Sequence, residues 1–138
     1  MSQTLLGFDY GTKRIGVAVG QDVTRNVTPL ITLHSQNEKP DWDAISKLIA
    51  EWQPDRLVVG LPLHLDGSPQ ALTEKAQRFG NQLKGRYNLP VEMVDERLTS
   101  HEAESEVGSR GGKTAKADID ALAAALILQS WLDQQSNE

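Results

Sequence analysis

The order of the apolar segments constrains the fold of this chain more than any other feature of its sequence. Residues 4–9 and 14–20 have the pattern of two buried strands joined by the short turn 10–13, so they predict a β-hairpin. Residues 26–34 have a weaker strand pattern, in which Pro29 indicates an edge or a bend. The chain is therefore expected to begin with a three-stranded antiparallel unit.

Two helix–strand units follow the hairpin. Apolar residues at spacings of three and four predict each helix, with Asp41 as the cap of the first, Ser68 as the cap of the second and Pro69 at the second helix's first position. Strands that alternate with helices in this way add to a sheet in parallel. The predicted segments are helices over 41–52 and 68–87 and strands over 56–63 and 89–96.

A strongly apolar helix completes the pattern. Residues 118–134 are apolar almost all round, so this helix must pack against the sheet. Thr99 lies three residues before Glu102, which is the capping-box spacing and predicts a short helix there, and the glycine-rich segment 108–117 predicts a loop. The whole order is typical of an α/β ribonuclease H-like fold, with a mixed five-stranded sheet flanked by helices.

Composition limits the class of protein. A length of 138 residues fits one domain, 1–138, and the absence of cysteine excludes disulfides and thiolate metal sites, so any metal should bind oxygen. A net charge of -5 argues against a protein that coats nucleic acid through bulk charge. No leader pattern and no run of about 20 apolar residues is present, so we expect a cytoplasmic protein with no membrane contact.

Three carboxylates occupy the ends of predicted elements. Asp9 ends the first strand, Glu96 follows the last strand beside Asp95, and Asp120 lies in the first turn of the final helix, with Asp118 one step outside it. In an open sheet, the carboxyl ends of the parallel strands form the natural site. Hard cations such as Mg²⁺ or Mn²⁺ prefer oxygen ligands, and two such ions can promote hydrolysis of a phosphodiester. We therefore expect Asp9, Glu96 and Asp120 to hold metal and act as catalytic residues.

Each acid also has a structural interpretation. Asp9 can form a turn with its own backbone, Asp95 and Glu96 can pair with Arg97 at the surface, and Asp120 can favour the positive end of the helix dipole. These interpretations do not explain why all three acids lie at element ends that fold onto one edge.

Cations near these acids are candidates for nucleic-acid binding through phosphates. They are Lys13 and Arg14 in the hairpin, Arg97 beside Glu96, and Arg110, Lys113 and Lys116 in the glycine-rich loop. We interpret Lys84 and Arg86 as ordinary solvated surface.

Four blocks of sequence closely resemble one known family. The blocks "FDYGTKRIGVAVG", "VVGLPLHLDGS", "DERLTSHEAE" and "IDALAAALIL" stand in the order and spacing of the YqgF-type pre-16S ribosomal RNA nucleases, also described as Holliday-junction-resolvase-like proteins. The resemblance spans nearly the whole chain. It implies a ribonuclease H-like fold, a divalent metal, and maturation of the 5′ end of small-subunit ribosomal RNA in the bacterial cytoplasm, with the site at Asp9, Glu96 and Asp120.

Two alternatives stay open beside a nuclease for structured RNA. A Holliday junction resolvase would bind branched DNA as a homodimer, but resolvases of this superfamily carry a fourth acid one helical turn after the third, where this chain has Ala123. The other alternative is a nucleic-acid-binding factor of the assembling small ribosomal subunit, without catalysis. The sequence leaves the choice between monomer and homodimer open.

Overall fold

The computed structural model describes residues 3–96 and 116–136. The short helix expected after Thr99 lies outside these residues, as does the expected loop up to residue 115. The described elements occur in the expected order. They are β1 (Thr4–Tyr10), β2 (Arg14–Gln21), β3 (Val27–His34), α1 (Trp42–Trp52), β4 (Arg56–Leu61), α2 (Ala71–Tyr87), β5 (Val91–Asp95) and α4 (Lys116–Ser136).

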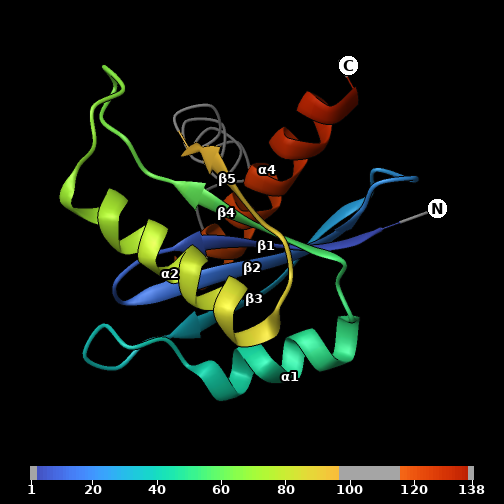
Figure 1. The fold of residues 1–138 in the computed structure, drawn as a ribbon, viewed down its shortest axis with the longest axis horizontal. Helices are drawn as coiled ribbons and strands as arrows, with labels where there is room; N and C mark the ends of the chain where they lie inside the picture. The colour runs from blue at the N-terminus through green and yellow to red at the C-terminus, as the bar shows by residue number, and fades with distance from the viewer. Residues whose placement is uncertain (1–2, 97–115, 137–138) are drawn as a thin grey trace.

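The five strands form one mixed sheet in the order β3-β2-β1-β4-β5. β1 and β2 are antiparallel, as are β2 and β3, whereas β4 is parallel to both β1 and β5 (Figure 1). The predicted hairpin unit and the parallel additions are confirmed. β1 and β5 are not neighbours, because β4 lies between them.

Helices α1 and α2 cover one face of this sheet (Figure 1). Alternate residues of the strands point toward these helices, as the period-two pattern predicts. Phe8 of β1 is fully buried there, and its ring meets that of Phe79 in α2 edge to face, with centroids 5.6 Å apart. Leu57, Val59 and Ile45 are fully buried in the same cluster. This is the larger core of the molecule.

Helix α4 packs on the opposite face, over strand residues that have little or no side chain. Gly16 and Gly20 lie on this face of β2, and an added Cβ at Gly16 would stand only 1.9 Å from the carbonyl oxygen of Asp120. Ala18, between them, is fully buried against Ala124. The alternation Gly-Val-Ala-Val-Gly therefore gives β2 one smooth face for a close helix and one apolar face for the main core.

The start of α2 differs from the prediction, which was wrong in naming Ser68 and Pro69. The helix begins at Ala71, and the backbone N–H of its N-cap residue, Gln70, donates to Thr73 Oγ1 at 2.9 Å. Ser68 is used elsewhere, since its backbone N–H and its hydroxyl both donate to Asp66 Oδ1, at 2.9 and 2.6 Å. The side chain of Ser68 therefore forms a local turn with Asp66 and does not cap the helix.

Two further helix starts test the prediction. Asp41 caps α1 as expected, with Oδ1 accepting from the N–H of Ala44 at 3.1 Å. The expectation of a loop through residue 117, with Asp118 at the edge of the last helix, was wrong, because α4 begins at Lys116. Lys and Ala are good helix formers, so the helix extends toward the N-terminus and places Asp120 beyond its first turn.

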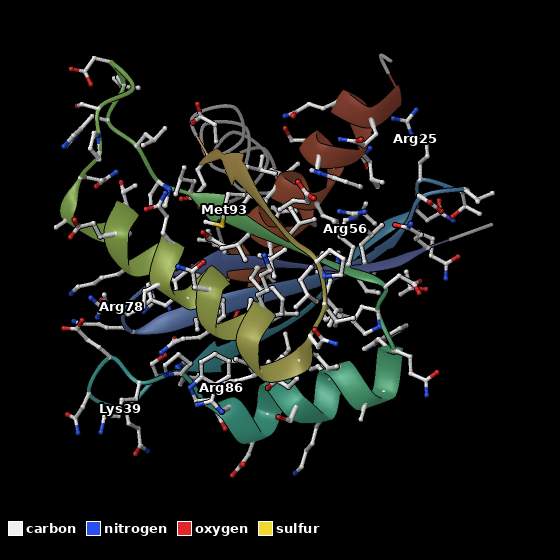
Figure 2. All side chains as sticks on the ribbon, viewed as in Figure 1. Arg25, Lys39, Arg56, Arg78, Arg86 and Met93 are labelled. Atoms are coloured by element: carbon white, nitrogen blue, oxygen red, sulfur yellow. The ribbon has the colours of Figure 1, made fainter. Side chains whose placement is uncertain are left out.

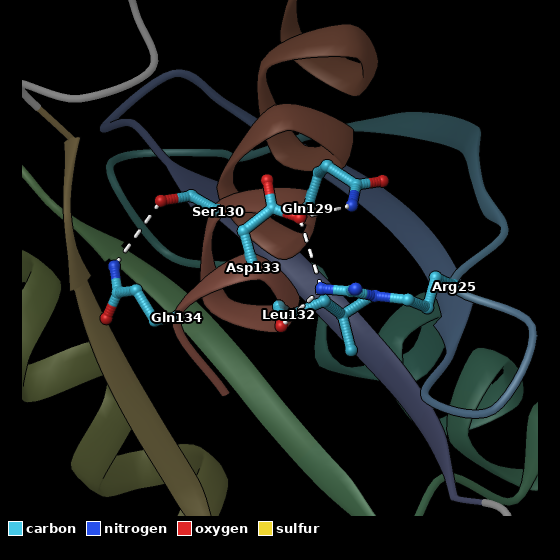
Figure 3. A network of polar contacts seen from close by, with 6 residues as sticks. All are labelled: Arg25, Gln129, Ser130, Leu132, Asp133 and Gln134. Carbon is cyan, nitrogen blue, oxygen red and sulfur yellow. Dashed lines mark hydrogen bonds and ion pairs between the residues drawn. The ribbon is translucent and has the colours of Figure 1, made fainter. Parts of the chain in front are cut away.

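The C-terminal half of α4 is tied to the β2–β3 connection. Arg25 Nη2 donates to the carbonyl oxygen of Leu132 at 2.9 Å and forms an ion pair with Asp133 Oδ1 at 3.3 Å (Figure 3). Gln129 also donates to Asp133, at 3.1 Å. None of the helices in the described part of the chain is long and apolar enough to span a membrane.

Candidate active site

Asp9 and Asp120 are brought together by the close packing of α4 on the sheet. Asp9 pairs with Gly16 across β1 and β2, so both residues face α4. The backbone of Asp120 lies directly over Gly16, closer than any side chain there would allow. Two residues more than one hundred positions apart therefore meet at one end of the sheet.

Glu96 reaches the same place from β5 because Gly60 leaves room above β4. Gly60 lies on β4, between β1 and β5, and a Cβ there would stand 2.7 Å from Glu96 Cγ and 2.5 Å from Ile127 Cδ1. With no side chain on Gly60, the Glu96 side chain crosses the strand and forms a hydrogen bond with Asp9. The structure thus brings Asp9, Glu96 and Asp120 to one site.

Burial and negative neighbours raise the pKa of Asp9 well above its ordinary value of 3.8. The largest cause is desolvation, followed by the hydrogen bond with Glu96 and by repulsion from Glu96 and then Asp120. Two carboxyl groups can share a hydrogen bond only when a proton lies between them. The site therefore has an excess of negative charge that a proton or another cation must offset.

Arg14 neutralises the third carboxylate. Its Nε donates to Asp120 Oδ2 at 2.7 Å, and the two side chains are 33% and 21% exposed. Arg14 was predicted to bind substrate phosphates, and this ion pair places it within the acidic site, bound to one of its carboxylates. Its guanidinium remains open to solvent on one side.

The donor set fits a hard divalent cation. Carboxylate oxygens are the preferred ligands of Mg²⁺ and Mn²⁺, and Asp9 and Glu96 are already in contact. Among residues 3–96 and 116–136, no three acidic or histidine side chains are arranged as a complete metal-binding group. Asp120 is engaged by Arg14 instead, so this carboxylate has to turn from the guanidinium before it can contribute to a three-ligand site.

The remaining predicted residues divide into those the structure describes and those it does not. Lys13 is exposed in the hairpin turn next to Arg14. Arg97, Arg110 and Lys113 lie outside the described residues. Lys116 is the first residue of α4, and its side chain is likewise not described.

Asp95 is separated from the site by the alternation of β5. It pairs with Leu61 and shares the face of Met93, which contacts α2 at Gly80, whereas Glu96 lies over Gly60 on the α4 side. Of this neighbouring pair, Glu96 is the member placed to act with Asp9.

Two features of the structure were not predicted from the sequence. Gly60 lies within β4 and opens the path for Glu96, a role that was not predicted. A glycine inside an apolar strand pattern, "LVVGL", is the signal that indicates such a close approach. Arg86 was interpreted as solvated surface; it is exposed, but its guanidinium packs over the ring of Trp42, 4.0 Å from the centroid.

Comparison with known proteins assigns the family. The family model described as "RuvX: Holliday junction resolvase" matches residues 3–134. The chain belongs to the RuvX family. Among its relatives, the "Putative pre-16S rRNA nuclease" of Glaesserella parasuis is 55% identical over 138 residues, covering 99% of this chain and 100% of the relative. A Pseudomonas putida protein of the same name is 54% identical, covering 94% of each chain.

Solved structures with a similar fold include resolvases. Thermus thermophilus RuvC in complex with a Holliday junction substrate has a TM-score of 0.60 at 16% identity, covering 98% of this chain and 96% of that chain. The fowlpox virus resolvase with Holliday junction DNA has a TM-score of 0.55 at 11% identity, covering 96% and 98%. These likenesses confirm the ribonuclease H-like fold of this RuvX chain.

Proposed function

We propose that this RuvX protein is a metal-dependent endonuclease that processes the 5′ end of pre-16S ribosomal RNA in the cytoplasm. The observation that carries the proposal is the contact between Asp9 and Glu96, with Asp120 beside them. Relatives named as pre-16S rRNA nucleases, more than half identical over nearly the whole chain, support the choice of substrate.

Each residue of the site has its own role in this proposal. Asp9 and Glu96 bind the cation and release the proton they share, because metal ligands must be deprotonated. A bound Mg²⁺ or Mn²⁺ supplies an activated water and stabilises the leaving oxygen of a phosphodiester. Asp120 completes the ligand set, and Arg14 is next to it. Arg14 and the exposed Lys13 position substrate phosphates at the edge of the site.

The test uses the purified chain and an in vitro transcribed precursor of the small-subunit RNA. With Mg²⁺ or Mn²⁺ we expect cuts near the 5′ end of the mature RNA, and with a chelator we expect none. A preparation that folds and binds the RNA, but does not cut it with either metal, would contradict the proposal.

Four-way-junction DNA belongs in the same assay as a competing substrate. The family description and the structural neighbours bound to Holliday junctions favour this second candidate function. A resolvase has to make two symmetric cuts, which requires a homodimer on the junction. Faster symmetric cleavage of the junction than of the RNA, by a dimer in sedimentation, would replace the RNA proposal with a resolvase.

A further inference from the structure

A cationic cavity lies on the face of the sheet opposite the acidic site. It has a volume of about 410 Å³ and is formed by Tyr10, Lys39, Trp42, Lys75, Arg78 and Arg86, among others. We call it the basic groove. Four of its nine lining residues are cations and one is an acid, although the chain as a whole has a net charge of -5. Such a concentration of positive charge in an acidic protein indicates an anionic partner.

The cations come from two elements that meet at this cavity. Lys75, Arg78 and Arg86 follow each other at helical spacing along one side of α2, and Lys39 lies in the connection between β3 and α1. Figure 2 shows Lys39, Arg78 and Arg86 on the same side of the molecule, away from Arg25 and Arg56. From Lys75 to Arg86 the helix rises about 16 Å, which exceeds the size of a single phosphate.

Contacts within the basic groove hold part of it in place. The ring of Trp42 is stacked on Phe79, with centroids 5.7 Å apart, and the exposed Arg86 has its guanidinium over the Trp42 ring, 4.0 Å from the centroid. Glu38 is the acid of the groove and pairs with Lys75 at 2.6 Å, through side chains that are 57% and 41% exposed. An ion pair this exposed contributes little to stability, so Lys75 can exchange Glu38 for another anion.

The basic groove opens at the same end of the sheet as the acids. Tyr10 follows Asp9 on β1 and points to the opposite face, where burial raises the pKa of its hydroxyl and the charges of Lys75, Glu38 and Arg78 act on it more weakly. A second cavity of about 370 Å³ shares Lys39 and Pro40 with the groove and extends to His34.

His34 connects this second cavity to the cations of the site. It pairs with Arg14 across β2 and β3, and the next residue, Ser35, donates its N–H to the carbonyl oxygen of Lys13 at 2.9 Å. The two cavities therefore extend from the cations of α2 to His34, whose partner on β2 is Arg14 of the acidic site.

We propose that the basic groove binds the phosphate backbone of the nucleic-acid substrate where it extends beyond the cleavage site. This proposal rests on the nuclease function and adds a second contact region to it. The Trp42 ring is already in contact with the ring of Phe79 and the guanidinium of Arg86, and the remaining charge of the groove comes from cations that suit phosphates. Binding there is through phosphates and independent of sequence.

The test measures RNA binding without cleavage. Fluorescence anisotropy with a labelled precursor RNA, in chelator and at several salt concentrations, compares the parent with the double variant Lys75→Gln/Arg78→Gln. We expect the double variant to bind at least about tenfold more weakly and to lower the slope of log K against log salt by about 1.5, as the loss of two phosphate contacts requires.

A second double variant, Lys47→Gln/Lys84→Gln, is the matched control. Lys84 lies nine residues after Lys75, which places it half a turn away on the other side of α2, and Lys47 is exposed on α1. We expect this control to bind within about twofold of the parent. Thermal melts show whether both double variants are folded.

The outcomes separate this proposal from the nuclease function. Equal affinity and equal salt slope for the two double variants would overturn the basic groove as a binding site, even if the parent cleaves RNA. Weaker binding by Lys75→Gln/Arg78→Gln, together with a parent that never cleaves, would support the basic groove as a binding site and contradict the nuclease function. A parent that binds no RNA in low salt would overturn both.

Discussion

The carboxyl groups of Asp9 and Glu96 form a hydrogen bond although their strands are not neighbours. The contact passes over Gly60, the one residue of β4 between them on this face, where any Cβ would lie 2.7 Å from Glu96 Cγ. A glycine inside a strand weakens packing and often marks a close approach of other groups. At Gly60 the missing side chain makes room for the contact between Asp9 and Glu96.

Asp9→Asn should make the metal-free protein more stable at neutral pH. The raised pKa of Asp9 means that the folded state binds its proton more tightly than the unfolded state. The stability that this proton contributes is fully present below the unfolded pKa of 3.8 and is lost as the pH rises through the folded pKa. Asparagine cannot ionise, so the variant does not lose this stability as the pH rises, and its amide can still donate a hydrogen bond to Glu96. Since about 1 kcal/mol corresponds to roughly 3–4 °C in a domain of this size, we expect Tm to rise by several degrees.

Melting curves in chelator between pH 4 and pH 8 measure this difference. The gap between Asp9→Asn and the parent should close at the acid end of the range. A constant gap, or a variant less stable than the parent at neutral pH, would show that ionisation of Asp9 does not destabilise the folded protein.

Gly60→Ala should destabilise the protein by about 1–3 kcal/mol, as overpacking in a filled core does. The new methyl group would overlap Ile127 Cδ1 and Glu96 Cγ, so Glu96 must move away from Asp9 and cleavage should fall with stability. Gly85→Ala is the matched control, because nothing lies within 4 Å of a Cβ there and alanine favours the helix by about 0.5–1 kcal/mol. Denaturant melts measure the free energy of unfolding of both variants. Equal values would contradict the close approach of Glu96 and Ile127 to Gly60.

Arg14→Gln should increase the affinity of the site for metal. The guanidinium competes with a cation for Asp120 Oδ2, so removing its charge frees a ligand and leaves more negative charge for the metal to offset. The measurement is the Mg²⁺ concentration that half-saturates the rise in Tm. We expect this midpoint to fall severalfold for Arg14→Gln and to stay near the parent's for Lys13→Gln, which alters the adjacent exposed cation. A midpoint that rises would mean that Arg14 helps to build the metal site instead of competing with it.

Arg25→Ala should lower stability by about 1–2 kcal/mol without changing cleavage at saturating RNA, because a charged hydrogen bond to a carbonyl is worth about that much. Arg25 holds the C-terminal half of α4 through Leu132, far from Asp120 along the helix. Asp133→Asn removes the charge from the exposed ion pair at 3.3 Å, keeps an Oδ1 acceptor for Gln129, and should cost less than about 0.5 kcal/mol. Similar losses of stability for both variants would show that the ion pair with Asp133, rather than the hydrogen bond to the Leu132 carbonyl, stabilises the position of α4.

The sequence predicted the fold because the fold depends on local patterns. Alternation in the strands and helical spacing in the helices each extend over a few residues, so the described elements and the mixed sheet could be deduced in order. The start of α2 was missed because Ser68 and Gln70 compete for the same role, and the choice depends on the turn at Asp66. The start of α4 was missed because good helix formers precede the acid expected to mark it.

The site was only partly predictable, since it depends on contacts between distant parts of the chain. Asp9, Glu96 and Asp120 were identified because each lies near an element end, but their meeting depends on Gly16 and Gly60. No local pattern shows which strand separates β1 from β5. The basic groove was missed for the same reason, since Lys39 and the cations of α2 come together only in the folded chain.

The most direct test of the carboxylate site compares single-turnover cleavage of the precursor RNA by Glu96→Gln and by Asp95→Asn, in Mg²⁺ and in Mn²⁺. The two acids are adjacent in sequence, but only Glu96 lies over Gly60 beside Asp9. Loss of a metal ligand should remove several kcal/mol of transition-state stabilisation, so we predict a rate at least about 100-fold lower for Glu96→Gln and within about threefold of the parent for Asp95→Asn. Cleavage by Glu96→Gln at the parent's rate would contradict the account.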